Sequence, residues 1–359
     1  MDKNKKYSPD LAIHPGITLK EELDFLGLTQ VELAQRSGLS TKHISQIINE
    51  VDPITSETAV KFELALGIPA DFWSNLQKNY ELSAARIEAE KKILAEIPEA
   101  KKFNCYNELA DLGYVEKTRD WAIKTKNLLK HFALNSFSLL PGVEQVAFRQ
   151  ATGNFDKLSL ASWLRCGALE AKKVEVEEFD KNKIKEILPE LKKLTMLPDG
   201  FGKKLQDLCA SVGVAVVFVP YFKNTKVNGA SRWIGGKAVI QLNTKGSFSD
   251  IFWFTFFHEI GHILLHGIKD QFVDYNGMDK NDKEKEADEF ASETLIPETE
   301  YKKLLNMGRP DAIYIGSFAR LNGIGKSIVY GRLAHDNLVS WRTIGHLREK
   351  LSIKNEEKE

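Results

Sequence analysis

Apolar residues near the N-terminus recur at the three- and four-residue spacing of short amphipathic helices, as at Leu19, Leu23 and Leu26. Residues that end helices separate these segments, namely Gly27, Gly38, Pro53, Gly67 and Pro69. This part of the chain is therefore predicted to form several short helices. A charged, alanine-containing segment over residues 81–92 follows and is predicted to be a connecting helix, which Pro98 interrupts.

The middle of the chain, residues 99–195, has helical spacing throughout. Helices are predicted at 107–113, where a glycine ends the segment, and then at 121–132 and 158–173. The stretch 172–193 is dense in charged residues and runs toward a proline. We place a domain boundary near its end, and the residues of this middle region suggest no chemistry.

The pattern changes after that boundary. A helix over 201–212 leads into the β-branched run 214–220, which predicts a buried strand. Two further apolar segments, 233–234 and 238–242, flank the dipeptide Gly235-Gly236. Two glycines suit the tight turns of β-hairpins, so these segments are predicted to pair.

Two longer helices are predicted over residues 248–267 and 282–295, and the chain beyond them has helical spacing. The expected fold is mainly α with a small β-sheet (α+β). The expected parts are an N-terminal helical bundle with its connector, a helical middle region, a C-terminal domain that contains the small sheet, and a tail, over residues 1–95, 96–190, 191–345 and 346–359.

The composition narrows the class of protein. The chain has 359 residues, of which 43% are hydrophobic and 28% charged, and its formal net charge is zero, which is typical of a globular protein with no general attraction to nucleic acid. The N-terminus has no apolar signal-peptide core, and the longest apolar run, 251–257, is too short to span a bilayer. The three separated cysteines form no C-x-x-C pair, so we expect buried thiols in a cytoplasmic protein.

The strongest chemical signal is His258-Glu259-Ile260-Gly261-His262. Two histidines four residues apart lie on one face of a helix, and imidazole nitrogens are ligands that Zn²⁺ favours. Glu259, beside the first histidine, can take a proton from water at the metal. Apolar residues flank the motif on both sides, and burying these polar groups without a purpose would be costly.

A zinc site needs a third protein ligand. His266 continues the four-residue spacing, but it would lie about 12 Å along an unbroken helix from His258, so we expect it to support the site instead. The following helix has a predicted core face that includes Ala287 and Phe290, and Glu286 borders it. We therefore predict His258, His262 and Glu286 as metal ligands, with the neighbouring acids Glu284, Asp288 and Glu289 facing solvent.

Other parts of the site have weaker signals. A peptide substrate could add to a free edge of the strand 238–242, although simple packing explains this strand equally well. A polar C-terminal stretch offers candidates to stabilise the oxyanion that would develop on a cleaved peptide carbonyl, namely His335, Tyr330 and Arg332. His266 is a candidate for a supporting role.

Residues 29–49 carry a second signal, of a different class. Thr29 and Ser40 are each predicted to cap a helix, and Gly38 occupies a turn that needs a positive φ angle, while Leu39 and Ile44 fill the space between the helices. This pattern predicts a helix-turn-helix whose second helix enters the DNA major groove. The predicted DNA-contacting residues are Gln30, Ser40, Thr41, Lys42, His43 and Gln46.

The charge of this region leaves an alternative open. Between residues 1 and 80, eleven acidic residues outnumber eight lysines and arginines, which is the reverse of the usual nucleic-acid footprint. A helical hairpin with a scaffold role is therefore the competing interpretation. If the segment binds DNA, we expect modest and salt-sensitive affinity.

The sequence from His258 to residue 267, followed by EADEFASETLIP and later GRLAHD, resembles the ImmA/IrrE family of zinc metallopeptidases over roughly residues 200–340. The resemblance implies that His258, His262 and the glutamate of the E-A-D segment, Glu286, bind Zn²⁺, and that Glu259 is the general base. It also implies cleavage of a transcriptional repressor or partner, although some members act without proteolysis.

Residues 14–80 resemble the HigA branch of Xre-type helix-turn-helix proteins, through HPGITLKEELDFLGLTQVELAQRSGLS and ITSETAVKFELALGIPADFWSNLQKNYEL. Members are commonly dimeric antitoxins that repress their own operon. The resulting expectation is a homodimeric regulator that binds double-stranded DNA at its own operator and cleaves a protein substrate, with a toxin as a further expected partner. The alternative is a repressor whose zinc domain only senses or docks a partner.

Overall fold

The computed structural model describes residues 11–143, 156–243, 248–266, 272–275, 282–306 and 311–351. Within these ranges the chain is mostly helical with one small sheet, as the sequence predicts. It divides into two compact units, residues 1–97 and 98–359. No helix in the described ranges combines the length and apolar character needed to cross a membrane.

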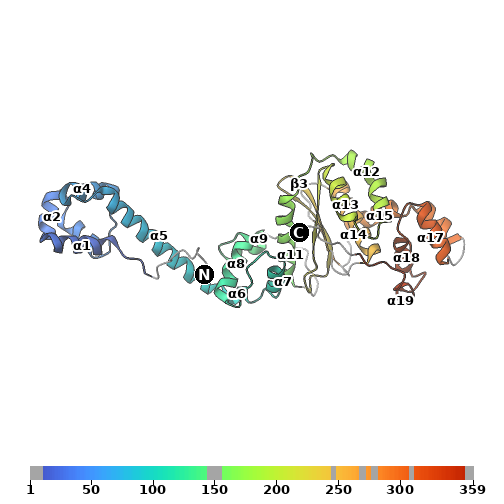
Figure 1. Ribbon diagram of the computed structural model, residues 1–359, viewed down its shortest axis with the longest axis horizontal. Coiled ribbons are helices and arrows are strands. Elements are labelled where there is room, and N and C mark those ends of the chain that lie inside the picture. The colour runs from blue at the N-terminus through green and yellow to red at the C-terminus, as the bar shows by residue number, and fades with distance from the viewer. Residues whose placement is uncertain are drawn as a thin grey trace. The chain divides into compact units, whose positions relative to one another are not determined.

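The described part of the first unit is a bundle of five helices, α1 to α5, which Figure 1 shows in blue. They are α1 (Pro15–Leu26), α2 (Gln30–Ser37), α3 (Thr41–Ile48), α4 (Ser56–Leu66) and α5 (Ala70–Ala95). The core of the bundle contains the fully buried side chains of Leu19, Leu33, Ile44, Phe62 and Trp73. Glycine at position 16 is needed because a Cβ there would lie 1.8 Å from the carbonyl oxygen of Ile47, so α1 begins directly against the end of α3.

The second unit contains the remaining elements. Its helices before the sheet are α6 (Ile97–Ala100), α7 (Tyr106–Asp111), α8 (Trp121–Phe132), a 3-10 turn η1 (Phe137–Leu139), α9 (Leu140–Val143), α11 (Lys157–Lys173), α12 (Lys181–Leu194) and α13 (Phe201–Ala210). The helices of the predicted middle region therefore belong to the same compact unit as the sheet. After the sheet begins, its helices are α14 (Ser249–Leu265), α15 (Asp282–Leu295), α16 (Glu298–Asn306), α17 (Ala312–Leu321), α18 (Lys326–His335) and α19 (Trp341–Ile344).

The sheet has the strand order β1-β3-β2-β4. The strands are β1 (Val214–Val219), β2 (Val227–Ile234), β3 (Lys237–Asn243) and β4 (Phe272–Tyr275). β1 runs parallel to β3, whereas β2 is antiparallel to both β3 and β4. The predicted hairpin is confirmed, since β2 and β3 pair across Gly235 and Gly236, which have φ angles of 60° and 81°.

The order of the strands overturns one prediction. β3, which contains residues 238–242, is paired on both sides and offers no edge to a peptide. The edges of the sheet are β1 and β4. Simple packing, the alternative interpretation of that strand, is the one that the structure supports.

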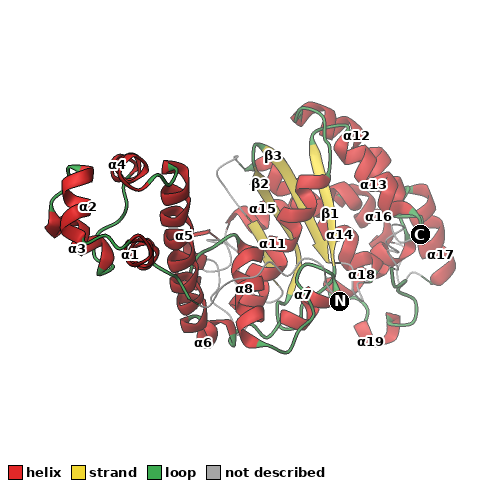
Figure 2. Ribbon diagram, turned by 60° about the vertical axis from the view of Figure 1, so that its left-hand side comes forward, coloured by secondary structure: helices red, strands yellow, loops and turns green. Residues whose placement is uncertain are grey.

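The two faces of the sheet carry different helices (Figure 2). On one face, Val214 and Val216 join the main core, to which α13 and α14 contribute. On the other face, Ala215 and Val217 pack against Ala171 of α11. This alternation follows from the two-residue period of a strand, and it explains why β1 is apolar at every position.

Candidate metal centre and nucleic-acid interface

The helix α14 holds the histidine motif inside the second unit. Its side chains are buried almost without interruption from Phe252 to Leu264, because one side packs against the sheet and the other against α15 and α18. His258 and His262 are each 2% exposed, and Glu259 is fully buried. The prediction of a buried motif helix is therefore confirmed.

Close packing between α14 and α15 sets the geometry of the centre. A Cβ added at Gly261 would lie 3.2 Å from the Cα of Ala287 and 3.1 Å from the Phe290 ring. Ala287 and Ala291 are fully buried at this contact. The small residues let the helices approach closely enough for short carboxylate side chains of α15 to reach the histidines of α14.

Three potential ligand atoms converge at this contact. His258 Nε2 lies 2.9 Å from His262 Nε2 and 3.1 Å from Glu284 Oε2. His262 Nε2 lies 3.5 Å from Glu284 Oε1. Two imidazole nitrogens and one carboxylate oxygen, all within 4.8 Å of one another, could hold a metal ion.

The chemistry of this donor set suits a divalent transition metal ion. Two imidazole nitrogens at such a short distance need a proton or a cation between them. Burial lowers the pKa of His262 below its usual value, against the opposing effect of Glu284, so its imidazole is neutral with a lone pair at neutral pH. Two histidines and one carboxylate, with a further position open, make up a ligand set of catalytic zinc sites.

Glu284 contributes a negative charge to the centre. Burial alone would raise its pKa, but the interactions with the imidazoles of His258 and His262 outweigh this effect and hold the pKa at about 2. The carboxylate is therefore ionised over the whole physiological pH range, as a metal ligand must be.

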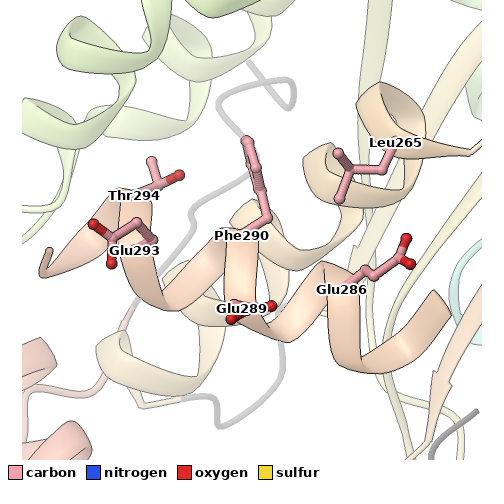
Figure 3. A pocket seen from close by; sticks show the side chains of 6 residues that line it. All are labelled: Leu265, Glu286, Glu289, Phe290, Glu293 and Thr294. Atoms are coloured by element: carbon pink, nitrogen blue, oxygen red, sulfur yellow. The ribbon is translucent and has the colours of Figure 1, made fainter. Parts of the chain in front are cut away.

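The structure does not bring Glu286 to the two histidines. Its side chain is 59% exposed, and its carboxylate lies 3.8 Å from Nδ1 of His266. It lines a surface pocket of about 500 Å³ on another side of α15 (Figure 3). That pocket is lined by Leu265, Glu286, Glu289, Phe290, Glu293 and Thr294.

Glu286 lies away from the two histidines because a different face of α15 packs against α14. The buried positions of α15 are Ala287, Ala291 and Leu295, so Glu284 and Asp288 share their face, while Glu286 turns away from it. The prediction that Glu284 and Asp288 face solvent is wrong, because their side chains are only 19% and 23% exposed and both contact His258. Phe290, a member of the predicted core face, is only half-buried.

His266 lies at the end of α14, next to the centre. Its ring centroid is 5.2 Å from that of His262, and its side chain is 4% exposed. Its Nε2 is 3.1 Å from the carbonyl oxygen of Lys283, and because a carbonyl can only accept, Nε2–H donates. His266 therefore ties the end of α14 to the first turn of α15.

The carboxylate of Glu259 packs against the sheet. A Cβ on Gly229 of β2 would lie 2.5 Å from Thr255 Cγ2 and 3.0 Å from Glu259 Oε1. Glycine at position 229 thus provides the space in which the Glu259 side chain lies.

The C-terminal candidates for oxyanion stabilisation lie on α18. Arg332 and His335 both contact Asp336, at 2.9 Å and 3.0 Å, and the His335 side chain is 78% exposed. Tyr330 is buried in the main core. Arg332 also packs over the ring of Tyr301 of α16.

In the first unit, the predicted helix-turn-helix corresponds to α2 and α3. Thr29 and Glu32 form a reciprocal capping box, and Ser40 Oγ accepts from the backbone N–H of His43 at 3.1 Å. Gly38 has a φ angle of 69°, and Ile44 is fully buried. The predicted caps, turn and core contact are all present.

The predicted DNA-contacting residues lie at the surface of this unit. Ser40, Thr41 and Lys42 are exposed, while Gln30, His43 and Gln46 are half-buried. His43 Nδ1 lies 3.1 Å from Asp52 Oδ2, so one predicted DNA-contacting residue pairs with an acidic side chain. The surface of α3 can meet a major groove, although one acidic side chain lies beside it.

Fold and site together define a two-part protein, with a helix-turn-helix unit and a unit that carries a buried histidine pair beside a carboxylate. Comparison with known families matches residues 19–73 to the helix-turn-helix family and residues 209–333 to the IrrE N-terminal-like domain of the M78 peptidases. The chain thus belongs to the helix-turn-helix family through its N-terminal unit, and its C-terminal unit contains an IrrE N-terminal-like domain.

Individual relatives match only about a quarter of the chain or less. The chain is 39% identical over 75 residues to virulence-associated protein I of Dichelobacter nodosus, a match that covers 21% of this chain and 69% of that protein. Among solved structures, a HigA-family antidote protein from Coxiella burnetii is 36% identical, covers 24% of this chain and 94% of its own, and has a TM-score of 0.23. The antitoxin HigA of Pseudomonas aeruginosa, solved with the higBA promoter, is 30% identical. The match covers 24% of this chain and 95% of that antitoxin, with a TM-score of 0.23.

Proposed function

We propose that the chain is a DNA-binding transcriptional regulator, similar to antitoxins, whose C-terminal unit is a zinc-dependent endopeptidase. The peptidase half rests on one observation, the convergence of His258, His262 and Glu284 inside an IrrE N-terminal-like domain. The proposed substrate is a repressor or partner protein, and the metal is proposed to be Zn²⁺.

In this proposal each residue of the centre has one task. His258 and His262 bind the metal through Nε2, and Glu284 binds it through a carboxylate oxygen. A divalent ion there would polarise a peptide carbonyl and acidify a water molecule. Glu259 accepts the proton of the attacking water on its carboxylate and passes it to the leaving amine.

The Glu259→Gln variant tests catalysis, because it removes the base and keeps the shape of the side chain. We expect it to retain zinc while a cleavage product of a repressor, or of the chain itself, disappears from cells. The readout is a comparison of protein N-termini in cells that carry the parent or the variant. The proposal fails if both produce the same N-termini.

The contact between Glu259 and Gly229 favours a second candidate function. A glutamate that packs tightly against a strand could serve the architecture of the domain alone. The protein would then be a repressor whose zinc domain senses or docks a partner without cutting it. Zinc binding together with an unchanged set of N-termini in Glu259→Gln would support this candidate.

The DNA-binding half rests on the helix-turn-helix match and on the exposed surface of α3. We propose that two copies of the chain bind the operator of its own gene, with Gln30, Ser40, Thr41, Lys42, His43 and Gln46 at the DNA. A toxin encoded beside this gene is a further proposed partner.

The test of DNA binding uses a duplex from the region upstream of the gene itself. Lys42→Ala combined with Gln46→Ala should weaken binding by about tenfold or more, because one phosphate contact and one base contact are lost. Lys61→Ala is the matched control, since Lys61 lies on α4 of the same unit and pairs with Glu57. Equal affinity of all three proteins would refute the role of α3, and the mass of the complex gives the number of copies bound.

A further inference from the structure

The imidazole of His258 faces two different carboxylates of α15, one at each ring nitrogen. Its Nε2 lies 3.1 Å from Glu284, within the converging ligand atoms, and its Nδ1 lies 2.9 Å from Asp288 Oδ1. Glu284 and Asp288 are four residues apart, so they lie on the same face of α15. The packing of α15 against α14 therefore places both carboxylates beside the ring of His258.

The contact with Asp288 has a consequence for the state of the ring. An ionised carboxylate can only accept a hydrogen bond, so the proton must be on Nδ1 of His258. In the neutral ring this leaves the lone pair on Nε2, where it can bind a cation that is shared with His262 and Glu284. The His258 ring is 2% exposed and Asp288 23%, so water competes little for this contact.

We propose that Asp288 is a positioning residue of the metal centre. Asp288 fixes the orientation and tautomer of His258 so that Nε2 faces a divalent cation. The negative charge of Asp288 also makes Nε2 a stronger electron-pair donor to that cation. The proposal rests on the metal site proposed above and deepens it, because it adds to the three ligands a residue that orients one of them.

A purely structural ion pair is the competing explanation. In that case both nitrogens of His258 would carry protons, one for each carboxylate, and the ring would tie α14 to α15 without binding metal. The two explanations differ in what removal of Asp288 does. An ion pair contributes to stability alone, whereas a positioning residue also controls the affinity for metal.

The first measurement is the zinc dissociation constant of the full-length chain, by competition with a chromophoric chelator. Asp288→Ala should weaken zinc binding by about 10- to 100-fold. Asp288→Asn should fall between that variant and the parent, because its amide oxygen still accepts from Nδ1–H but carries no charge. Glu289→Gln, at the next and exposed position, should bind zinc like the parent.

The second measurement is the ¹⁵N–¹H spectrum of the histidine rings in the zinc-loaded chain. The parent should show zinc on Nε2 of His258 and a slowly exchanging, hydrogen-bonded Nδ1–H, and the hydrogen bond should be lost in Asp288→Ala. If Asp288→Ala binds zinc as tightly as the parent, or if His258 carries protons on both nitrogens in the loaded chain, the role of Asp288 is refuted. Failure of the parent itself to bind zinc would refute the metallopeptidase proposal together with this one.

Discussion

At the scale of single residues, burial controls the protonation of a histidine that does not belong to the proposed metal centre. His131, at the end of α8, is 6% exposed. Its burial, together with the nearby charge of Arg165, lowers its pKa to about 4 from a usual value of 6.5. Between these two values the unfolded chain binds a proton that the folded chain does not.

The free energy of unfolding should therefore fall as the pH drops from 6.5 to 4, by about 3 kcal/mol from this residue. His131→Gln removes the titrating group, so its stability should depend less steeply on pH in this window, by about the same amount. Denaturant titrations of both proteins at pH 7, 5.5 and 4 measure the difference. Identical pH profiles would show that His131 titrates normally.

The proposed metal ligands show how far single residues can be predicted from sequence. His258 and His262 are predictable because their i, i+4 spacing alone places them on one face of a helix. The third ligand, a carboxylate, is harder to predict, because α15 has acidic residues on several sides. Glu284 and Glu286 are distinguished only by the rotation of the helix, which the buried Ala287 and Ala291 determine.

At the scale of elements, local patterns predict more than the pairing of distant segments. The hairpin of β2 and β3, the motif helix α14 and the caps of α2 and α3 all follow from short-range spacing and turn residues. The position of β3 between β1 and β2 does not, because it depends on a parallel pairing with a strand from an earlier segment. The free edge predicted for β3 was wrong for this reason.

The contact between α14 and α15 yields a prediction at this scale. Ala287→Leu enlarges a fully buried residue that touches Gly261, and it should push the helices apart. We expect a loss of about 1–3 kcal/mol in stability and weaker zinc binding, because Glu284 moves away from the histidines. Lys285→Leu, at an exposed position of the same helix, is the control.

Both quantities are measured on the same samples, stability by thermal unfolding and zinc affinity by chelator competition. If Ala287→Leu loses stability but binds zinc like the parent, the spacing of the two helices does not control the centre.

At the scale of the whole molecule, each compact unit has its own hydrophobic core. The proposed metal ligands all belong to the second unit, so bound zinc should stabilise that unit alone. Zinc at a hundredfold excess over its dissociation constant adds about 2.7 kcal/mol to the free energy of unfolding.

Calorimetry of the full-length chain should accordingly resolve two unfolding transitions. A chelator should lower the midpoint of the transition with the larger enthalpy, which belongs to the larger unit 98–359, and leave the other unchanged. A single transition, or an equal shift of both, would contradict independent units with one metal site.

The most direct test of the central claim compares the zinc content of three purified proteins: the parent, Glu284→Gln and Glu286→Gln. The two variants make the same chemical change two residues apart on α15, once at the histidine pair and once at the exposed surface. We predict about one zinc ion per chain in the parent and in Glu286→Gln, and a loss of zinc in Glu284→Gln. A parent without zinc, or a loss in Glu286→Gln with retention in Glu284→Gln, would contradict the metal centre described for this protein.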